Sequence, residues 1–132
     1  MYKKQILQLF ACLLVCALAI PVYAQHGGMV RLGDAHVDGN VDHDSIHVGR
    51  SDGKFRAIQL HISGGAINFE RVVVRFGNGT TEELPIHSTI PDGGNTRLID
   101  LPGDHRSIES VDLWYSKASW SHHPKVTLYG AR

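Results

Sequence analysis

Cysteine is missing from the sequence after residue 24, because both cysteines, Cys12 and Cys16, lie in an apolar segment near the start. A chain without cysteine in its folded part has neither a disulfide framework nor a thiolate metal site. Any metal ion would therefore have to be held by histidine and carboxylate side chains.

The sequence also has no excess of positive charge beyond its first 24 residues. Removing Lys3 and Lys4 from the 13 basic residues leaves 11 against 13 acidic residues, which is a formal charge of −2. Proteins that bind nucleic acid need basic side chains to neutralise the phosphate backbone. We therefore expect no nucleic acid among the partners.

No stretch repeats its apolar residues with the 3.6-residue period of an amphipathic helix. Apolar and polar residues instead alternate in short runs bounded by Gly, Pro, Asn and Asp, which is typical of half-buried strands. The runs are Met29–Val37, Ser45–Val48, Phe55–Ile62, Ile67–Phe76, Glu82–Ile90, Thr96–Leu101, Ile108–Tyr115 and Lys125–Gly130. Seven or eight short strands without a helix predict an all-β antiparallel sandwich, and we favour the jelly-roll type.

Turn residues and alternation refine this pattern. Gly77-Asn78-Gly79 is the strongest turn signal, because Asn-Gly adopts the positive φ angles of a tight hairpin. Pro85 cannot donate a ladder hydrogen bond, so its strand is predicted to lie at an edge or to carry a bulge. Alternation on either side of the Pro102-Gly103 turn assigns four residues to the core: Leu101, Val111, Leu113 and Tyr115.

The first 24 residues have the layout of a secretory signal peptide. Lys3 and Lys4 give a positive start, Leu9–Ile20 is an uninterrupted apolar run, and Pro21–Ala24 supplies a cleavage site. The apolar run is too short for a membrane span, and no stop-transfer pattern follows it.

A lipoprotein anchor at Cys16 is the alternative for this segment. However, Val15 stands where a lipoprotein signal has a small residue, and the apolar run continues past the cysteine. We favour cleavage after Ala24, which leaves residues 25–132 as a single β-sandwich domain without a membrane-spanning segment. We expect this domain to be periplasmic or secreted.

Histidine is unusually frequent, with nine residues that all follow position 24. The densest group of imidazole and carboxylate side chains consists of His36, His43 and His47 with Asp38, Asp42 and Asp44, and we take His36, Asp38, His43 and His47 as the candidate ligands. Zinc, nickel and copper accept such ligands. The spacing matches no known site and histidine is common on surfaces, so a metal-binding envelope protein that uses residues 36–47 is our alternative interpretation.

Catalytic motifs are missing apart from one short match. Gly49-Arg50-Ser51-Asp52-Gly53 fits G-x-S-x-G, but that motif needs its serine on a turn between a strand and a helix. A strand pattern follows here, so we interpret the segment as a polar loop. Without paired carboxylates, a usable triad or a cofactor motif, we expect a protein that is not an enzyme and needs no cofactor.

Aromatic residues near the end of the chain are the best candidates for a binding surface. Alternation places Trp114 and Asp112 on the outer side of one strand and Tyr129 on the outer side of the last, with Trp120 in the connecting loop. If these two strands pair, both rings share an outer face and could stack on a sugar. This predicts a non-catalytic binding module for a glycan or an unknown envelope component, whereas the plainer alternative is that both rings pack under a loop.

Three charged residues, Arg56, Asp100 and Arg106, stand among apolar neighbours. A partly buried charge has to be paired. We therefore predict a structural ion pair between Asp100 and these arginines at one end of the sandwich. The functional alternative is an anion-binding pocket built on the two arginines.

Several motifs together resemble a known family. They are Val48-Gly49-Arg50 followed by Phe55-Arg56-Ala57-Ile58, then Val74 with Phe76-Gly77-Asn78-Gly79, then Arg97-Leu98-Ile99-Asp100-Leu101-Pro102-Gly103 followed by Arg106, Ile108, Val111 and Trp114-Tyr115. Over residues 30–130 the chain is similar to a family of small exported bacterial proteins that is catalogued only as a domain of unknown function. The resemblance implies an envelope or periplasmic β protein and carries no activity, ligand or catalytic residue.

Overall fold

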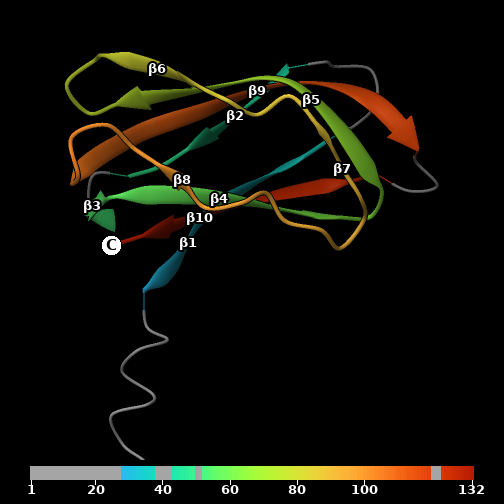
Figure 1. Ribbon diagram of the computed structural model, residues 1–132, viewed down its shortest axis with the longest axis horizontal. Coiled ribbons are helices and arrows are strands. Elements are labelled where there is room, and N and C mark those ends of the chain that lie inside the picture. The colour runs from blue at the N-terminus through green and yellow to red at the C-terminus, as the bar shows by residue number, and fades with distance from the viewer. Residues whose placement is uncertain (1–27, 38–42, 50–51, 120–122) are drawn as a thin grey trace, which may run out of the picture.

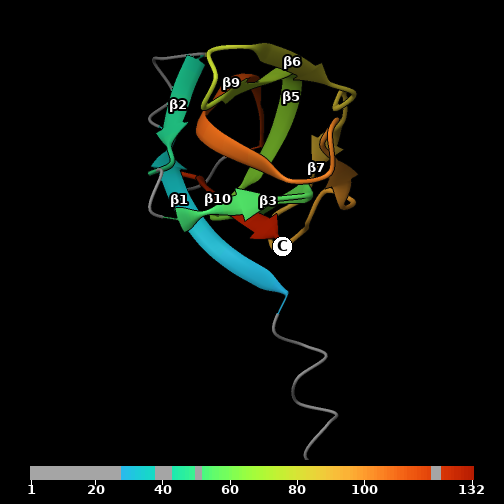
Figure 2. The same cartoon turned by 90° about the vertical axis from the view of Figure 1, so that its left-hand side faces the viewer.

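The computed structural model describes residues 28–37, 43–49, 52–119 and 123–132, and this part of the chain is all-β. Two antiparallel sheets pack face to face (Figures 1 and 2). The strands of the described residues are β1 (Met29–His36), β2 (His43–His47), β3 (Lys54–Phe55), β4 (Ala57–Ser63), β5 (Ala66–Phe76), β6 (Thr81–Leu84), β7 (Thr89–Ile90), β8 (Ile99–Asp100), β9 (Arg106–Ser119) and β10 (Lys125–Ala131). The described residues include no helix of the length and apolarity that a membrane crossing requires.

The strand order is that of a jelly roll. The first sheet runs β1-β10-β4-β8 and the second β2-β9-β5-β6, with β3 paired to β9 and β7 paired to β5. When β3 is counted with β2 and β7 with β6, this is the order of an eight-stranded jelly roll. The predicted antiparallel sandwich is therefore confirmed. Because the chain crosses repeatedly between the sheets, neighbouring strands come from distant parts of the sequence.

Two of the predicted strands are divided. The run Phe55–Ile62 changes sheet at Arg56, whose N–H donates to Ala131 O at 2.8 Å, so that β3 pairs in the second sheet and β4 in the first. The run Glu82–Ile90 forms β6 and β7, with Pro85 between them. Both short strands lie beside β5 at the edge of the second sheet, which confirms the predicted edge position.

The predicted hairpin joins β5 to β6 at Gly77-Asn78-Gly79. Gly79 has a φ of 88°, and its N–H donates to Phe76 O at 2.9 Å. Asn78 Oδ1 accepts hydrogen bonds from the Thr80 N–H at 3.1 Å and from Thr80 Oγ1 at 2.7 Å. These contacts fix the turn at one end of the sandwich.

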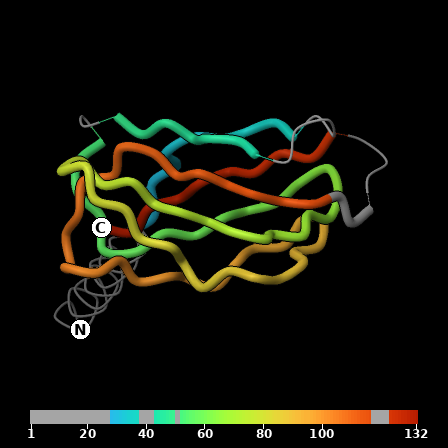
Figure 3. The backbone as a smooth tube through the Cα atoms, turned by 90° about the horizontal axis from the view of Figure 1, so that it is seen from above, coloured from blue at the N-terminus to red at the C-terminus, as the bar shows by residue number. Residues whose placement is uncertain are grey.

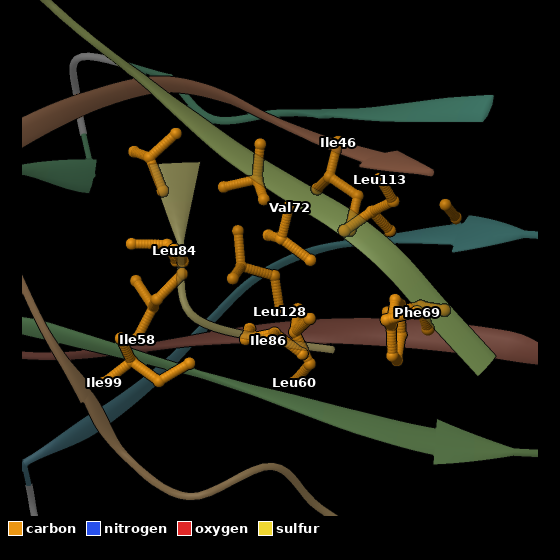
Figure 4. Packing of buried hydrophobic residues seen from close by; sticks show 14 of the residues in the cluster. Ile46, Ile58, Leu60, Phe69, Val72, Leu84, Ile86, Ile99, Leu113 and Leu128 are labelled. Carbon is orange, nitrogen blue, oxygen red and sulfur yellow. The ribbon is translucent and has the colours of Figure 1, made fainter. Parts of the chain in front are cut away.

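Apolar side chains from both sheets fill the space between them (Figure 4). The four residues assigned to the core from alternation, Leu101, Val111, Leu113 and Tyr115, are all buried, as predicted. Burying one such side chain contributes about 1.5–3 kcal/mol relative to leaving it exposed. The Tyr115 hydroxyl, at the margin of this core, donates to Asp44 Oδ2 at 2.8 Å.

β1 and β2 lie along the same side of the sandwich, one in each sheet (Figures 2 and 3). A Cβ at Gly33 in β1 would lie 2.9 Å from Ile46 Cγ2 in β2, so the glycine permits this close approach. The outer face of the first sheet and the outer face of the second sheet therefore lie on opposite sides of the molecule.

Candidate functional site

Trp114 and Tyr129 face outward, as predicted, but from different sheets. β9 lies between β2 and β5 in the second sheet, whereas β10 lies between β1 and β4 in the first. The prediction that the two rings share an outer face is therefore wrong, because the chain crosses the sandwich between these strands instead of forming a hairpin. Trp120, the third aromatic residue of that prediction, lies outside the described residues.

Trp114 is enclosed by side chains from the two neighbouring strands. The His43 ring of β2 stacks on it, with the ring centroids 4.4 Å apart and the planes at 16°. The Arg71 guanidinium of β5 lies 4.9 Å from the indole centroid. Because β2 and β5 flank β9 on opposite sides, these groups contact the indole from opposite sides.

The polar groups around Trp114 are paired with one another. Arg71 Nε lies 3.3 Å from Glu83 Oε1, and His43 Nε2 lies 3.7 Å from Asp112 Oδ1. A ring covered from both sides leaves little open face for a sugar, and its charged neighbours already have partners. The arrangement favours a structural role for Trp114.

Tyr129 lies in an open, shallow pocket of about 280 Å³ on the outer face of the first sheet. We call this the Tyr129 pocket, and its lining residues are Met29, Gln59, His61, Asn95 and Tyr129. Tyr129 is half-buried, while Met29 is 42% exposed and extends the apolar surface of the ring. Gln59 stands opposite Tyr129 in the register of β4 and β10, so the amide and the ring are direct neighbours.

Hydrogen bonds hold the polar side chains of the Tyr129 pocket in place. Gln59 Nε2 donates to Thr96 O at 2.8 Å, which leaves Gln59 Oε1 as an acceptor. His61 Nδ1 lies 2.7 Å from Asn95 Oδ1. With the amide oxygen as acceptor, Nδ1 carries the hydrogen, so a neutral imidazole leaves Nε2 as an acceptor and Asn95 leaves its NH₂ as a donor. The pocket thus presents both donors and acceptors.

Charge around the Tyr129 pocket is balanced. Its lining, which consists of described residues, includes no side chain with a permanent charge. Arg31, which stands opposite Tyr129 on β1, forms an ion pair with Asp34. An uncharged lining beside a neutralised pair suits a neutral polar ligand better than an ion.

The predicted ion pair at Asp100 is not present among the described residues. Asp100 and Arg56 are both exposed, and Arg56 Nε donates instead to Arg132 O at 3.0 Å. Arg106 donates to a backbone carbonyl and a threonine hydroxyl. The prediction was wrong because Arg56 and Asp100 lie at the surface, so neither charge has to be paired with another side chain.

The predicted metal-binding histidines are not brought together. His36 lies on β1 in the first sheet, whereas His43 and His47 lie on β2 in the second. No group of three or more His, Cys, Asp or Glu placed to hold a metal ion occurs in the described part of the chain, which does not include Asp38.

The G-x-S-x-G match lies between two strands, β2 and β3. Its first and fourth residues contact each other, with the Asp52 N–H donating to Gly49 O at 3.1 Å. The serine of the motif lies outside the described residues. A loop between two strands, as expected from the sequence, is not the strand-to-helix turn of a nucleophile elbow.

Residues 9–130 match the family described as domain of unknown function (DUF2541), and the chain belongs to this family. The resemblance seen in the sequence to a family of unknown function is thus confirmed. No curated protein sequence matches the chain.

Two solved structures to which this chain is similar come from different organisms. AlgX of Pseudomonas aeruginosa matches 78% of this chain with 11% identity and a TM-score of 0.48, and the match spans only 26% of that protein. The family 29 carbohydrate-binding module CBM29_1 of Piromyces equi matches 81% of this chain and 83% of its own length, with 12% identity and a TM-score of 0.44. Such low identities and scores say nothing about the ligand of this chain.

Proposed function

We propose that this member of the DUF2541 family is an exported, non-catalytic module that binds a neutral glycan in the Tyr129 pocket. One observation carries the proposal: an open aromatic ring is surrounded by fixed, uncharged side chains that offer both hydrogen-bond donors and acceptors.

A sugar ring matches this chemistry on both of its surfaces. Its C–H face is apolar and stacks on an aromatic ring, here Tyr129 with Met29 beside it. Its hydroxyl groups donate and accept hydrogen bonds, which suits the amides of Gln59 and Asn95 and the imidazole of His61. A neutral lining also avoids the desolvation of an unpaired charge when the ligand binds.

The size of the contact limits the affinity. Stacking contributes about 0.5–1.5 kcal/mol and each neutral hydrogen bond a net contribution of about 0.5–1.5 kcal/mol. Association itself costs several kcal/mol, so an open pocket of this kind fits weak binding, with a Kd between about 10 μM and 1 mM.

The lining of the pocket also supports a role without catalysis. Hydrolysis of a glycosidic bond uses two carboxyl groups on either side of the bond. The described residues that line the Tyr129 pocket include neither Asp nor Glu.

Export is supported by the signal-like layout of residues 1–24. The family match begins at residue 9, so it includes the whole apolar run Leu9–Ile20. The apolar run is therefore part of the sequence that the family shares. We expect N-terminal sequencing of the protein recovered from the periplasm or medium to begin at Gln25. Recovery of intact residues 1–24 on a protein that stays in the cytoplasm would contradict export.

Glycan binding is tested by calorimetry against a panel of neutral polysaccharides and oligosaccharides. We expect Tyr129→Ala to weaken the affinity of the parent about two- to twelvefold, because the stacking contribution of about 0.5–1.5 kcal/mol is lost. Trp114→Ala, which removes an aromatic ring from the opposite face, is the matched control and should bind within about twofold of the parent. Equal binding by Tyr129→Ala, or no binding of any neutral glycan by the parent, would overturn the proposal.

A further inference from the structure

A second pocket, of about 400 Å³, lies at one end of the sandwich. We call it the end pocket, and its lining residues are Lys54, Phe76, Gly77, Asn78, His105, Arg106 and Ser107. Figures 1 and 3 show the three contributing segments near the C-terminus: β3, the β5–β6 turn and the start of β9. None of these segments takes part in the Tyr129 pocket.

The lining of the end pocket is positively charged. It includes two permanent cations, Lys54 and Arg106, and the imidazole of His105, while none of its described residues is acidic. Lys54 and Ser107 stand opposite each other in the register of β3 and β9, which places an ammonium group and a hydroxyl group at the same rim. Lys54 is exposed and has no ion-pair partner among the described residues.

Arg106 is held in a defined position. Its Nη1 donates to Pro102 O at 2.9 Å and its Nη2 to Thr80 Oγ1 at 3.2 Å. The guanidinium also lies 3.8 Å from the centroid of the Phe76 ring. These contacts use two of its five N–H groups, so the others stay available to a ligand without a further change of conformation.

Asn78 is oriented through the same contacts. Thr80 Oγ1, which accepts from Arg106, donates in turn to Asn78 Oδ1 at 2.7 Å. Since this amide oxygen is already used twice, the group that Asn78 has left for a ligand is its NH₂. The end pocket is therefore rich in donors, whereas the Tyr129 pocket presents donors and acceptors.

We infer that the end pocket binds an oxyanion, a carboxylate, sulfate or phosphate group, carried on a molecule about the size of a monosaccharide. Charge-assisted hydrogen bonds from an ammonium and a guanidinium are the strongest that such a group forms in proteins. The pocket volume of about 400 Å³ falls in the range of small-molecule sites and exceeds that needed for an inorganic ion alone. This inference does not depend on glycan binding at Tyr129.

The test is an NMR titration of the ¹⁵N-labelled, full folded protein with four probes: sodium sulfate, sodium phosphate, glucuronic acid and glucose. We expect at least one of the three anions to shift the backbone amides of Lys54, Arg106 and Ser107 with saturation, and expect added NaCl to weaken the binding. Glucose should leave these amides unchanged. The anion that binds identifies the source of the oxyanion, whereas no response to any anion, or an equal response to glucose, would overturn the inference.

Two variants and a matched control assign the binding to this pocket. Lys54→Ala and Arg106→Gln should each weaken the affinity for the anion about tenfold or more, while Lys125→Ala, a lysine at the far end of β10, should leave it unchanged. Because Arg106 also packs on Phe76, Lys54→Ala at an exposed position is the cleaner variant. A folded Lys54→Ala protein with the anion affinity of the parent would overturn the assignment.

Discussion

In the described part of the chain each outer face of the sandwich carries one large aromatic side chain, but the surroundings of the two rings differ. Trp114 on the second sheet is contacted by His43 and Arg71, whose polar atoms already face carboxylates. Tyr129 on the first sheet opens into a pocket whose amides and imidazole keep unused donors and acceptors. The first arrangement stabilises a sheet, and the second leaves interactions available to a ligand.

This difference shows that an outward aromatic residue does not by itself identify a binding surface. An outward ring can bind a ligand only if the side chains on the neighbouring strands leave it uncovered and keep polar atoms that are not already paired with one another. At Trp114 these neighbours come from β2 and β5, and at Tyr129 they come from β1 and β4. The end pocket adds a third environment, in which the available groups are mainly cationic donors.

The larger expected effect concerns the inner side of β10, directly beside Tyr129. A Cβ at Gly130 would lie 2.6 Å from Phe55 Cδ1 and 2.9 Å from Leu32 Cδ1, so Gly130→Ala would overpack the core. We expect the free energy of unfolding to fall by about 1–3 kcal/mol, as measured by urea denaturation. The folded fraction of the Gly130→Ala protein should still bind the glycan, since the substitution lies on the inner side of β10 and leaves the outer face unchanged.

The control for this variant is Gly28→Ala, because a Cβ at Gly28 meets no atom within 4 Å. We expect its stability to match that of the parent within about 0.5 kcal/mol. A Gly130→Ala protein with the same free energy of unfolding as Gly28→Ala would contradict the close packing of β10 against Phe55.

A smaller effect on stability separates the two aromatic residues. Trp114→Ala removes a stacked ring pair and a cation–π contact, which together contribute about 1–2 kcal/mol. We expect this variant to lose more stability than Tyr129→Ala in the same denaturation experiment, although Tyr129→Ala loses the glycan affinity. The opposite order in both measurements would reverse the roles assigned to the two faces.

Much of the fold follows from local pattern. Alternation in the sequence predicts that Val111 and Leu113 point inward and Trp114 outward, and the structure agrees. The hairpin at Gly77-Asn78-Gly79 also follows from local backbone preference. The division at Arg56 is not predicted, because the run Phe55–Ile62 is interpreted as one strand, whereas the burial pattern shifts by one residue where the chain changes its partner and both Phe55 and Ile58 are buried.

The candidate site depends on contacts that no local pattern shows. Alternation places Gln59 and His61 on the outer side of their strand, but only the pairing of β4 with β10 brings them to Tyr129. Asn95 reaches the same pocket from a loop through its contact with His61. The ion pair predicted at Asp100 failed for a different reason, since Arg56 and Asp100 are exposed and not partly buried as the pattern had indicated.

The sequence by itself determined which side of most strands faces the core and where several turns lie, because backbone sterics and alternation act within a few residues. Only the tertiary structure decided that Trp114 and Tyr129 lie on opposite faces. Strand order depends on hydrogen bonds between strands that are far apart in the sequence and on the packing of the whole core. Both depend on every strand at once and not on any local run of residues. For that reason the inward and outward sides of most strands could be predicted locally, whereas the surroundings of each outward ring could not.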